Sequence, residues 1–170
     1  MNSPFPFLTL ITFIPAVTGA IILLMPKERG TLIKSTAAVA TLISAVLTFF
    51  IFITYDKTAG GYQFIEGPYD WVKSLGISYL VGADGINLVM LILTGIVSFM
   101  GVLISWGINE RPKEFFAFFL FLVAGVYGVF MSLDLFLLIF FYELSIYPMY
   151  FLIANWGWPV TREYAAMKLT

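Results

Sequence analysis

The stretch that decides the fold is INLVMLILTGIVSFMGVLISW, residues Ile86–Trp106, which has 21 residues and no formal charge. An α-helix rises about 1.5 Å per residue, so about 20 apolar residues cross the ~30 Å hydrocarbon core of a bilayer. An uncharged apolar run of this length is typical of a membrane span rather than of a soluble core. The stretch therefore predicts a transmembrane helix.

Four more stretches of the chain have the same character. We expect spans at about Phe5–Met25, Ser35–Tyr55, Phe115–Leu133 and Leu135–Ala154, and an incomplete sixth at Thr161–Thr170. Of the 170 residues, 61% are hydrophobic and only 11% are charged, whereas soluble domains contain about 25% charged residues. The sequence therefore predicts an all-α integral membrane protein with five complete transmembrane helices and the start of a sixth.

The composition also excludes several kinds of chemistry. The chain contains no Cys and no His, which removes disulfides, iron–sulfur clusters, haem histidines and the usual zinc sites. Its net charge of −1 offers no basic surface for nucleic acid, and it has no glycine-rich phosphate loop. We therefore expect a partner bilayer, no cofactor or metal in this chain, and any electron transfer in other chains.

The basic residues indicate an orientation. Lys57 and Lys73 lie between the second and third spans, and the other seven of the nine lie after the first, third and fifth spans: Lys27, Arg29, Lys34, Arg111, Lys113, Arg162 and Lys168. Because Lys and Arg are retained on the cytoplasmic side of a membrane, we expect the N-terminus outside. We expect the membrane to be a bacterial plasma membrane.

The external connection from Asp56 to Asp84 differs in composition from the spans. Two short aromatic-rich runs, Tyr62–Ile65 and Tyr69–Val72, are separated by turn residues, which favours a small β-hairpin. Asp84 stands just before the third span, where a carboxylate can cap the helix; we prefer this structural role to a binding role. In the fourth span, Ala124 and Gly128 form a small-xxx-small pair that predicts close helix packing.

Glu143 is the one charged residue far from a helix end. It is the ninth residue of the fifth span, ~13 Å from the outer end and near the midplane. A charge there costs at least ~2.5–3.5 kcal/mol on insertion scales, and intramembrane carboxylates usually line a bundle interior or an ion path. Two bland alternatives remain open: a permanently neutral, hydrogen-bonded acid, or a misplaced span.

The neighbours of Glu143 favour a hydrated proton site. Pro148 cannot donate to the carbonyl of Leu144, so we expect helix five to be kinked or locally unwound there. Tyr147 and Tyr150, four and seven residues on, share the helical face of Glu143 and add hydroxyls that can hold water. A low-dielectric environment favours a neutral carboxyl and a nearby cation favours the charged one, so a Glu with a movable cationic partner is a switchable proton binder.

Lys168 is the only candidate for such a partner within the sequence. It lies one to two turns into the sixth helix. The alternative is that its side chain merely extends to the cytoplasmic interface, and the sequence does not separate these two roles.

The residues around Glu143 resemble a known family. The segments FYELSIYPMYFLI (141–153), Asn155-Trp156-Gly157 and REYAAMK (162–168) are similar to the fifth-helix signature of subunit M of NADH-quinone oxidoreductase, an antiporter-like, proton-translocating subunit of complex I. Gly82–Ile86 resembles the motif that opens the third helix of that family, and the external loop with Glu66 and Trp71 is similar as well. The resemblance covers the whole chain.

The resemblance implies a larger fold of about fourteen helices built on two inverted repeats, of which this chain would be the N-terminal portion. It also implies that Glu143 transfers protons and pairs with a lysine of a later helix, and that Lys168 has a less certain role in the same path. The chain would then be a membrane-arm subunit of respiratory complex I, an oxidoreductase that pumps protons. NADH, flavin, iron–sulfur clusters and quinone would be held by partner subunits.

Two alternative functions remain at this stage. The chain could belong to a multisubunit Na⁺/H⁺ antiporter or to the membrane arm of an energy-converting hydrogenase. It could also be a structural membrane scaffold in which Glu143 is a neutral packing residue. Titration of Glu143 separates transport from scaffold, and the co-purifying subunits separate complex I from an antiporter.

Overall fold

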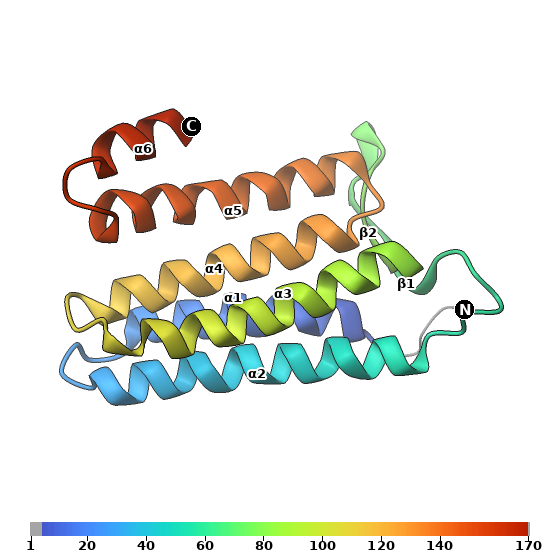
Figure 1. Cartoon of the computed structure of the whole chain (residues 1–170). Coiled ribbons are helices and arrows are strands. Elements are labelled where there is room, and N and C mark those ends of the chain that lie inside the picture. The colour runs from blue at the N-terminus through green and yellow to red at the C-terminus, as the bar shows by residue number, and fades with distance from the viewer. Residues whose placement is uncertain (1–4, 170) are drawn as a thin grey trace.

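The computed structural model describes residues 5–169, and it is a bundle of long helices lying side by side with a β-hairpin across one end (Figure 1). Within that range, five helices are long and apolar enough to cross a membrane. They are α1 (Phe7–Leu24), α2 (Gly30–Thr54), α3 (Gly85–Ile104), α4 (Pro112–Met131) and α5 (Leu135–Trp156). A short helix, α6 (Arg162–Leu169), folds back along α5. The predicted fold class is confirmed.

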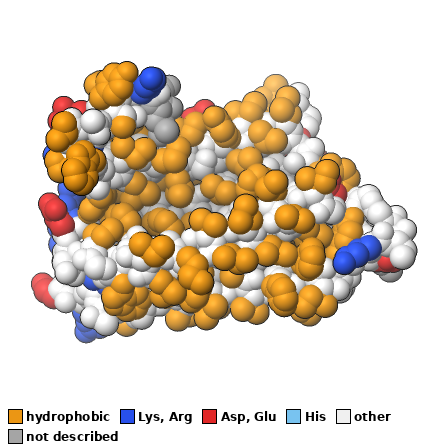
Figure 2. All heavy atoms as spheres, in the orientation of Figure 1, with side chains coloured by type: hydrophobic (Ala, Val, Ile, Leu, Met, Phe, Trp, Pro, Cys, Tyr) orange, Lys and Arg blue, Asp and Glu red, His pale blue; other side chains and the backbone are white. Residues whose placement is uncertain are grey.

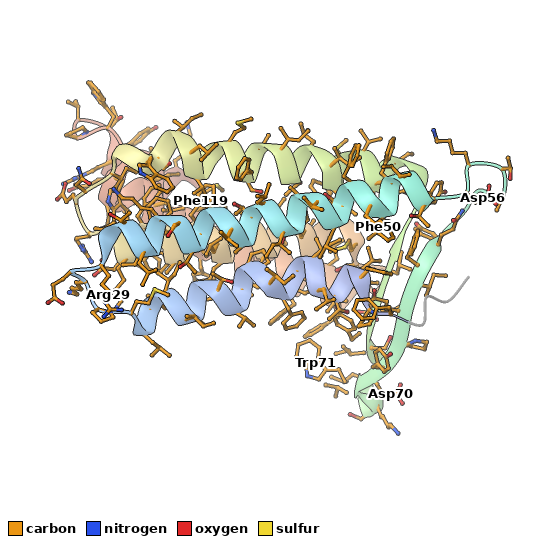
Figure 3. All side chains as sticks on the ribbon, turned by 90° about the horizontal axis from the view of Figure 1, so that it is seen from below. Arg29, Phe50, Asp56, Asp70, Trp71 and Phe119 are labelled. Carbon is orange, nitrogen blue, oxygen red and sulfur yellow. The ribbon has the colours of Figure 1, made fainter. Side chains whose placement is uncertain are left out.

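The bundle has two distinct ends, and charged side chains gather at them. One end, here called the loop end, holds the connections α1–α2, α3–α4 and α5–α6; the other, the hairpin end, holds the β-hairpin and the α4–α5 turn (Figure 1). Hydrophobic side chains cover the length of the helices between them (Figure 2). Arg29 lies at the loop end, and Asp56 and Asp70 lie at the hairpin end (Figure 3). An apolar belt between two charged rims is the surface that a bilayer requires.

One boundary prediction was wrong. Lys34 does not lie in the connection before the second span, because α2 begins at Gly30 and contains it. The ammonium is buried and donates to the carbonyl oxygen of Trp106 at 2.7 Å and to Oδ1 of Asn109 at 2.9 Å. A long lysine stem can run along apolar surface while its head reaches acceptors at the end of a neighbouring helix. Lys34 therefore joins α2 to the segment after α3 at the loop end.

The helix α4 lies at the centre of the bundle and packs against α1 and α5 most extensively. Gly125 and Gly128 are the points of closest approach to α5: a Cβ on Gly125 would lie 2.8 Å from Cβ of Ser145, and one on Gly128 would overlap the ring of Phe141. Small residues let two helix backbones approach in this way. The small residues of the fourth span therefore determine how α5 is seated.

We expect Gly128→Ala to destabilise the protein by about 1–3 kcal/mol, because the new methyl group must displace the Phe141 ring from a packed interface. The measurement is thermal unfolding of the full-length protein in detergent. Gly107→Ala is the matched control, since a Cβ on Gly107 would meet nothing within 4 Å. Equal unfolding temperatures for the two variants would contradict the predicted contact.

The connection after α2 forms an antiparallel hairpin. Strand β1 (Gln63–Val72) pairs with β2 (Ile77–Ala83), and the turn between them contains a 3₁₀ segment, Lys73–Leu75, and Gly76 with φ +67°. A left-handed φ of this kind is tolerated best by glycine. The amide of Leu133, beyond α4, donates to the carbonyl of Leu80 at 2.9 Å, so the hairpin is attached to the α4–α5 turn.

Candidate functional site

The helix α5 packs on α4 with one side only. Its buried residues are Leu137, Phe141 and Pro148. At 100° per residue, Glu143 lies about 120–160° around the helix axis from these residues. The side that carries Glu143 is here called the α5 open face, and it consists of Phe136, Ile139, Phe140, Glu143, Tyr147, Tyr150 and Phe151.

Glu143 lies in the middle of this face. It is exposed in the described chain, and within residues 5–169 its carboxylate has no hydrogen-bond or ion-pair partner. It is about 12 Å along the axis from the start of the 22-residue helix. Charged residues are absent from α1 and α3, and those of α2 and α4 lie within the first five residues of each helix. Glu143 is therefore the charge that lies deepest in the apolar belt.

Aromatic contacts border Glu143 on both sides along α5. Toward the hairpin end, the Trp71 ring packs edge-on against Phe136 and Phe140, with ring centroids 6.1 and 5.3 Å apart. Toward the loop end, Tyr147, Tyr150 and Phe151 line a groove of about 380 Å³ with Met167 of α6. The α5 open face is thus bordered by the hairpin at one end and by α6 at the other, and Glu143 stands between them.

Pro148 does not unwind the helix. The α-helix is continuous from Leu135 to Trp156 with Pro148 inside it, so the expected local unwinding near Leu144–Pro148 was wrong. The fixed φ of proline is close to the helical value, so the missing N–H can be absorbed within a continuous helix. The proline is also buried on the α4 side rather than on the face of Glu143, whereas Tyr147 and Tyr150 do follow Glu143 along the open face.

The structure does not bring Lys168 to Glu143. Among the described residues, no ion pair joins the two side chains. The ammonium of Lys168 lies 5.7 Å from the centroid of the Tyr164 ring on the same helix, and Lys168 is exposed. In this arrangement Lys168 makes a cation–π contact one turn back along α6.

The sequence comparisons place this site in a known family. No family model matches the chain. The chain is 36% identical over 169 residues to an NAD(P)H-quinone oxidoreductase chain 4 of Picosynechococcus sp., 35% to one of Nostoc sp. and 34% to one of Synechocystis sp.; each alignment covers 99% of this chain. The chain belongs to the NAD(P)H-quinone oxidoreductase chain 4 family. It spans about 30% of the length of these relatives.

A solved structure shows the same fold. The membrane-bound sulfane sulfur reductase, an archaeal respiratory membrane complex, contains a chain that superposes with a TM-score of 0.81 at 18% identity, covering 97% of this chain and 33% of that one. The predicted relationship to NADH-quinone oxidoreductase is confirmed by the relatives. With five apolar helices of spanning length, this member of the family is an integral membrane protein.

Asp84 caps α3. Its carboxylate accepts hydrogen bonds from the amides of Ile86 at 3.0 Å and Asn87 at 2.7 Å, and the side chain of Asn87 accepts from the Asp84 amide at 2.7 Å. This reciprocal capping box satisfies two amides that an α-helix leaves unpaired at its start. Asp134 caps α5 in the same way, through the amides of Phe136 and Leu137.

Glu66 is the functional residue for which the sequence analysis found no role. It belongs to β1, yet its buried carboxylate accepts hydrogen bonds from the amides of Leu8 at 2.7 Å and Thr9 at 3.0 Å, in the first turn of α1, and from the hydroxyl of Thr9. The residue before α1 is Pro6, which has no side-chain acceptor. That missing cap was the only signal that an acceptor from elsewhere was needed.

Tyr79 extends the Glu66 network. The Thr9 hydroxyl gives its one proton to Glu66, so the Tyr79 hydroxyl, 2.8 Å away, is the donor to Thr9. Burial raises the pKa of Tyr79 above its ordinary value, which keeps the phenol protonated and able to donate. Residues from β1, α1 and β2 are therefore joined at the hairpin end.

Proposed function

We propose that this chain is part of a proton-translocating membrane-arm subunit of a respiratory complex, and that Glu143 is its proton-carrying group. The observation that carries the proposal is the unpartnered carboxylate of Glu143 in the middle of the α5 open face. A bare carboxylate facing lipid at this depth would be costly, whereas one that meets further protein can bind and release a proton. Its place in the family favours the second arrangement.

The chemistry follows from the surroundings of Glu143. A carboxyl group in a low-dielectric site is neutral, and the approach of a cation favours its ionised form. A lysine on a helix that covers the α5 open face would supply that cation, and the hydroxyls of Tyr147 and Tyr150 would hold water beside it. Proton uptake and release by Glu143 then follow the position or charge of that lysine.

The redox part of the function belongs to other chains in this proposal. The curated relatives are named as chains of NAD(P)H-quinone oxidoreductase. By analogy, NADH, flavin, iron–sulfur clusters and quinone are held by partner subunits, and this chain contributes to proton export through the membrane arm. The test is Glu143→Gln in the assembled complex: loss of coupled proton transport supports the proposal, and a fully coupled variant leaves the scaffold function.

We propose that the loop end faces the cytoplasm and the N-terminus lies outside. Seven of the nine Lys and Arg residues lie at the loop end or on α6, which follows it. We expect a membrane-impermeant thiol reagent added from outside to label Gly60→Cys at the hairpin end and to miss Asn109→Cys at the loop end. Both variants should be labelled once the membrane is opened with detergent. The reverse pattern in intact cells would contradict this orientation.

A further inference from the structure

A small polar pocket lies at the loop end, apart from the α5 open face. It has a volume of about 180 Å³ and lies between the α3–α4 connection and the α5–α6 turn. It is lined by Glu110, Arg111, Ala154, Asn155, Trp156 and Arg162. None of these residues has a role in the function proposed above.

Arg111 is held toward this pocket by an unusual backbone. Its φ is +50°, although it is neither glycine nor a residue favoured in that region, and it directly precedes Pro112. Both facts oppose the conformation, since the residue before proline normally adopts extended backbone. The guanidinium lies 5.8 Å from the centroid of the Trp156 ring, and its Nε is 3.7 Å from Oε1 of Glu114. The indole nitrogen of Trp156 in turn donates to the carbonyl of Glu110 at 2.9 Å, which fixes the ring.

Arg162 is the complementary half of the pocket. It is partly buried at the start of α6, and within residues 5–169 its guanidinium has no hydrogen-bond or ion-pair partner. A partly desolvated guanidinium without an acceptor favours an anion, because its planar fork can donate two parallel hydrogen bonds to one phosphate or carboxylate. The lining charges are Arg111 (+1), Arg162 (+1) and Glu110 (−1), so the pocket has a net charge of +1.

The pocket stands where the apolar belt of the bundle ends. Trp156 and the exposed Trp158 lie on either side of the turn after α5, at the position where aromatic side chains mark a membrane–water interface. Basic pockets at this level between helices are the type of site that holds lipid headgroups. We propose that this pocket binds the phosphate of an anionic phospholipid. The net charge of +1 is neutralised by a lipid with one negative charge, whereas a zwitterionic lipid leaves it unbalanced.

The test uses the full-length protein in its purified complex, with phosphatidylglycerol as the probe. We expect Arg162→Gln to lower retention of phosphatidylglycerol on the order of ten-fold, because two charge-assisted hydrogen bonds to the phosphate are lost. This variant should fold, since Arg162 bonds to nothing in the described chain. Arg29→Gln is the matched control: it removes the same charge at the same end, at the α1–α2 connection, and should not change retention (Figure 3).

Three results would overturn the inference. Equal retention of phosphatidylglycerol by Arg162→Gln and the parent protein would show that the pocket does not hold it. Equal binding of phosphatidylcholine would contradict the charge argument. Full displacement of the lipid by millimolar inorganic phosphate would make this a free-phosphate site rather than a lipid site. Because the readout is bound lipid, failure of the proton-carrier proposal would not affect it.

Discussion

We expect Glu143→Gln to remove most of the coupled proton transport of the assembled complex without lowering its amount in the membrane. Gln keeps the size and the hydrogen-bonding capacity of a protonated Glu but cannot release a proton. Losing a positioned proton donor typically costs ~10²-fold or more in rate, and the same order is expected here. The measurement is proton pumping by the complex in sealed vesicles, compared with its redox turnover and its subunit content.

Three companion variants make this result specific. Glu143→Asp should retain part of the pumping, because the carboxylate survives on a shorter arm. Glu163→Gln removes an exposed carboxylate in the first turn of α6 and should leave pumping unchanged. Lys168→Met should cause a milder loss than Glu143→Gln, since Lys168 lies over the Tyr164 ring and forms no ion pair with Glu143. Pumping by Glu143→Gln at the parental ratio of protons to electrons would leave Glu143 as a packing residue.

The second large effect is expected at the hairpin end. Glu66→Ala should destabilise the protein by about 2–4 kcal/mol, because three donors of the first turn of α1 lose their charged acceptor inside a buried site. Truncation also leaves the Thr9 hydroxyl, to which Tyr79 donates, without its acceptor. Thermal unfolding of the full-length protein in detergent measures the loss, and proteolysis near residue 60 reports whether the hairpin has detached.

Asp70→Asn is the matched control for Glu66→Ala. Asp70 is an acidic residue on the same strand, but it is exposed and its ion pair is with Lys73 at 3.5 Å. An exposed pair of this kind contributes about 0–1 kcal/mol, so a small change is expected. Glu66→Gln should fall between the two, because its amide keeps one acceptor oxygen and places an NH₂ group against backbone donors. Equal stability of Glu66→Ala and Asp70→Asn would show that Glu66 does not hold α1.

The sequence by itself determined the features that depend on residues close together in the chain. The apolar runs placed five helices, because a segment that crosses a bilayer must satisfy its own backbone and present apolar side chains all round. The turn residues between residues 56 and 84 indicated the hairpin, and the position of Asp84 before an apolar run indicated a helix cap. The depth of Glu143 follows in the same way, since it depends only on counting residues along one helix.

Only the tertiary structure decided which distant groups meet. Glu66 caps a helix that starts 59 residues earlier, at Phe7, and Lys34 reaches a carbonyl 72 residues away. Nothing in the local pattern of either residue names its partner, because the partner is chosen by how the helices pack. The same packing turned α5 so that Phe141 sits on Gly128 and Glu143 faces away from α4, and it put Pro148 on the buried side. Hydrophobic periodicity could not indicate that rotation, since a membrane helix is apolar on every side and loses the polar face that orients a helix in water.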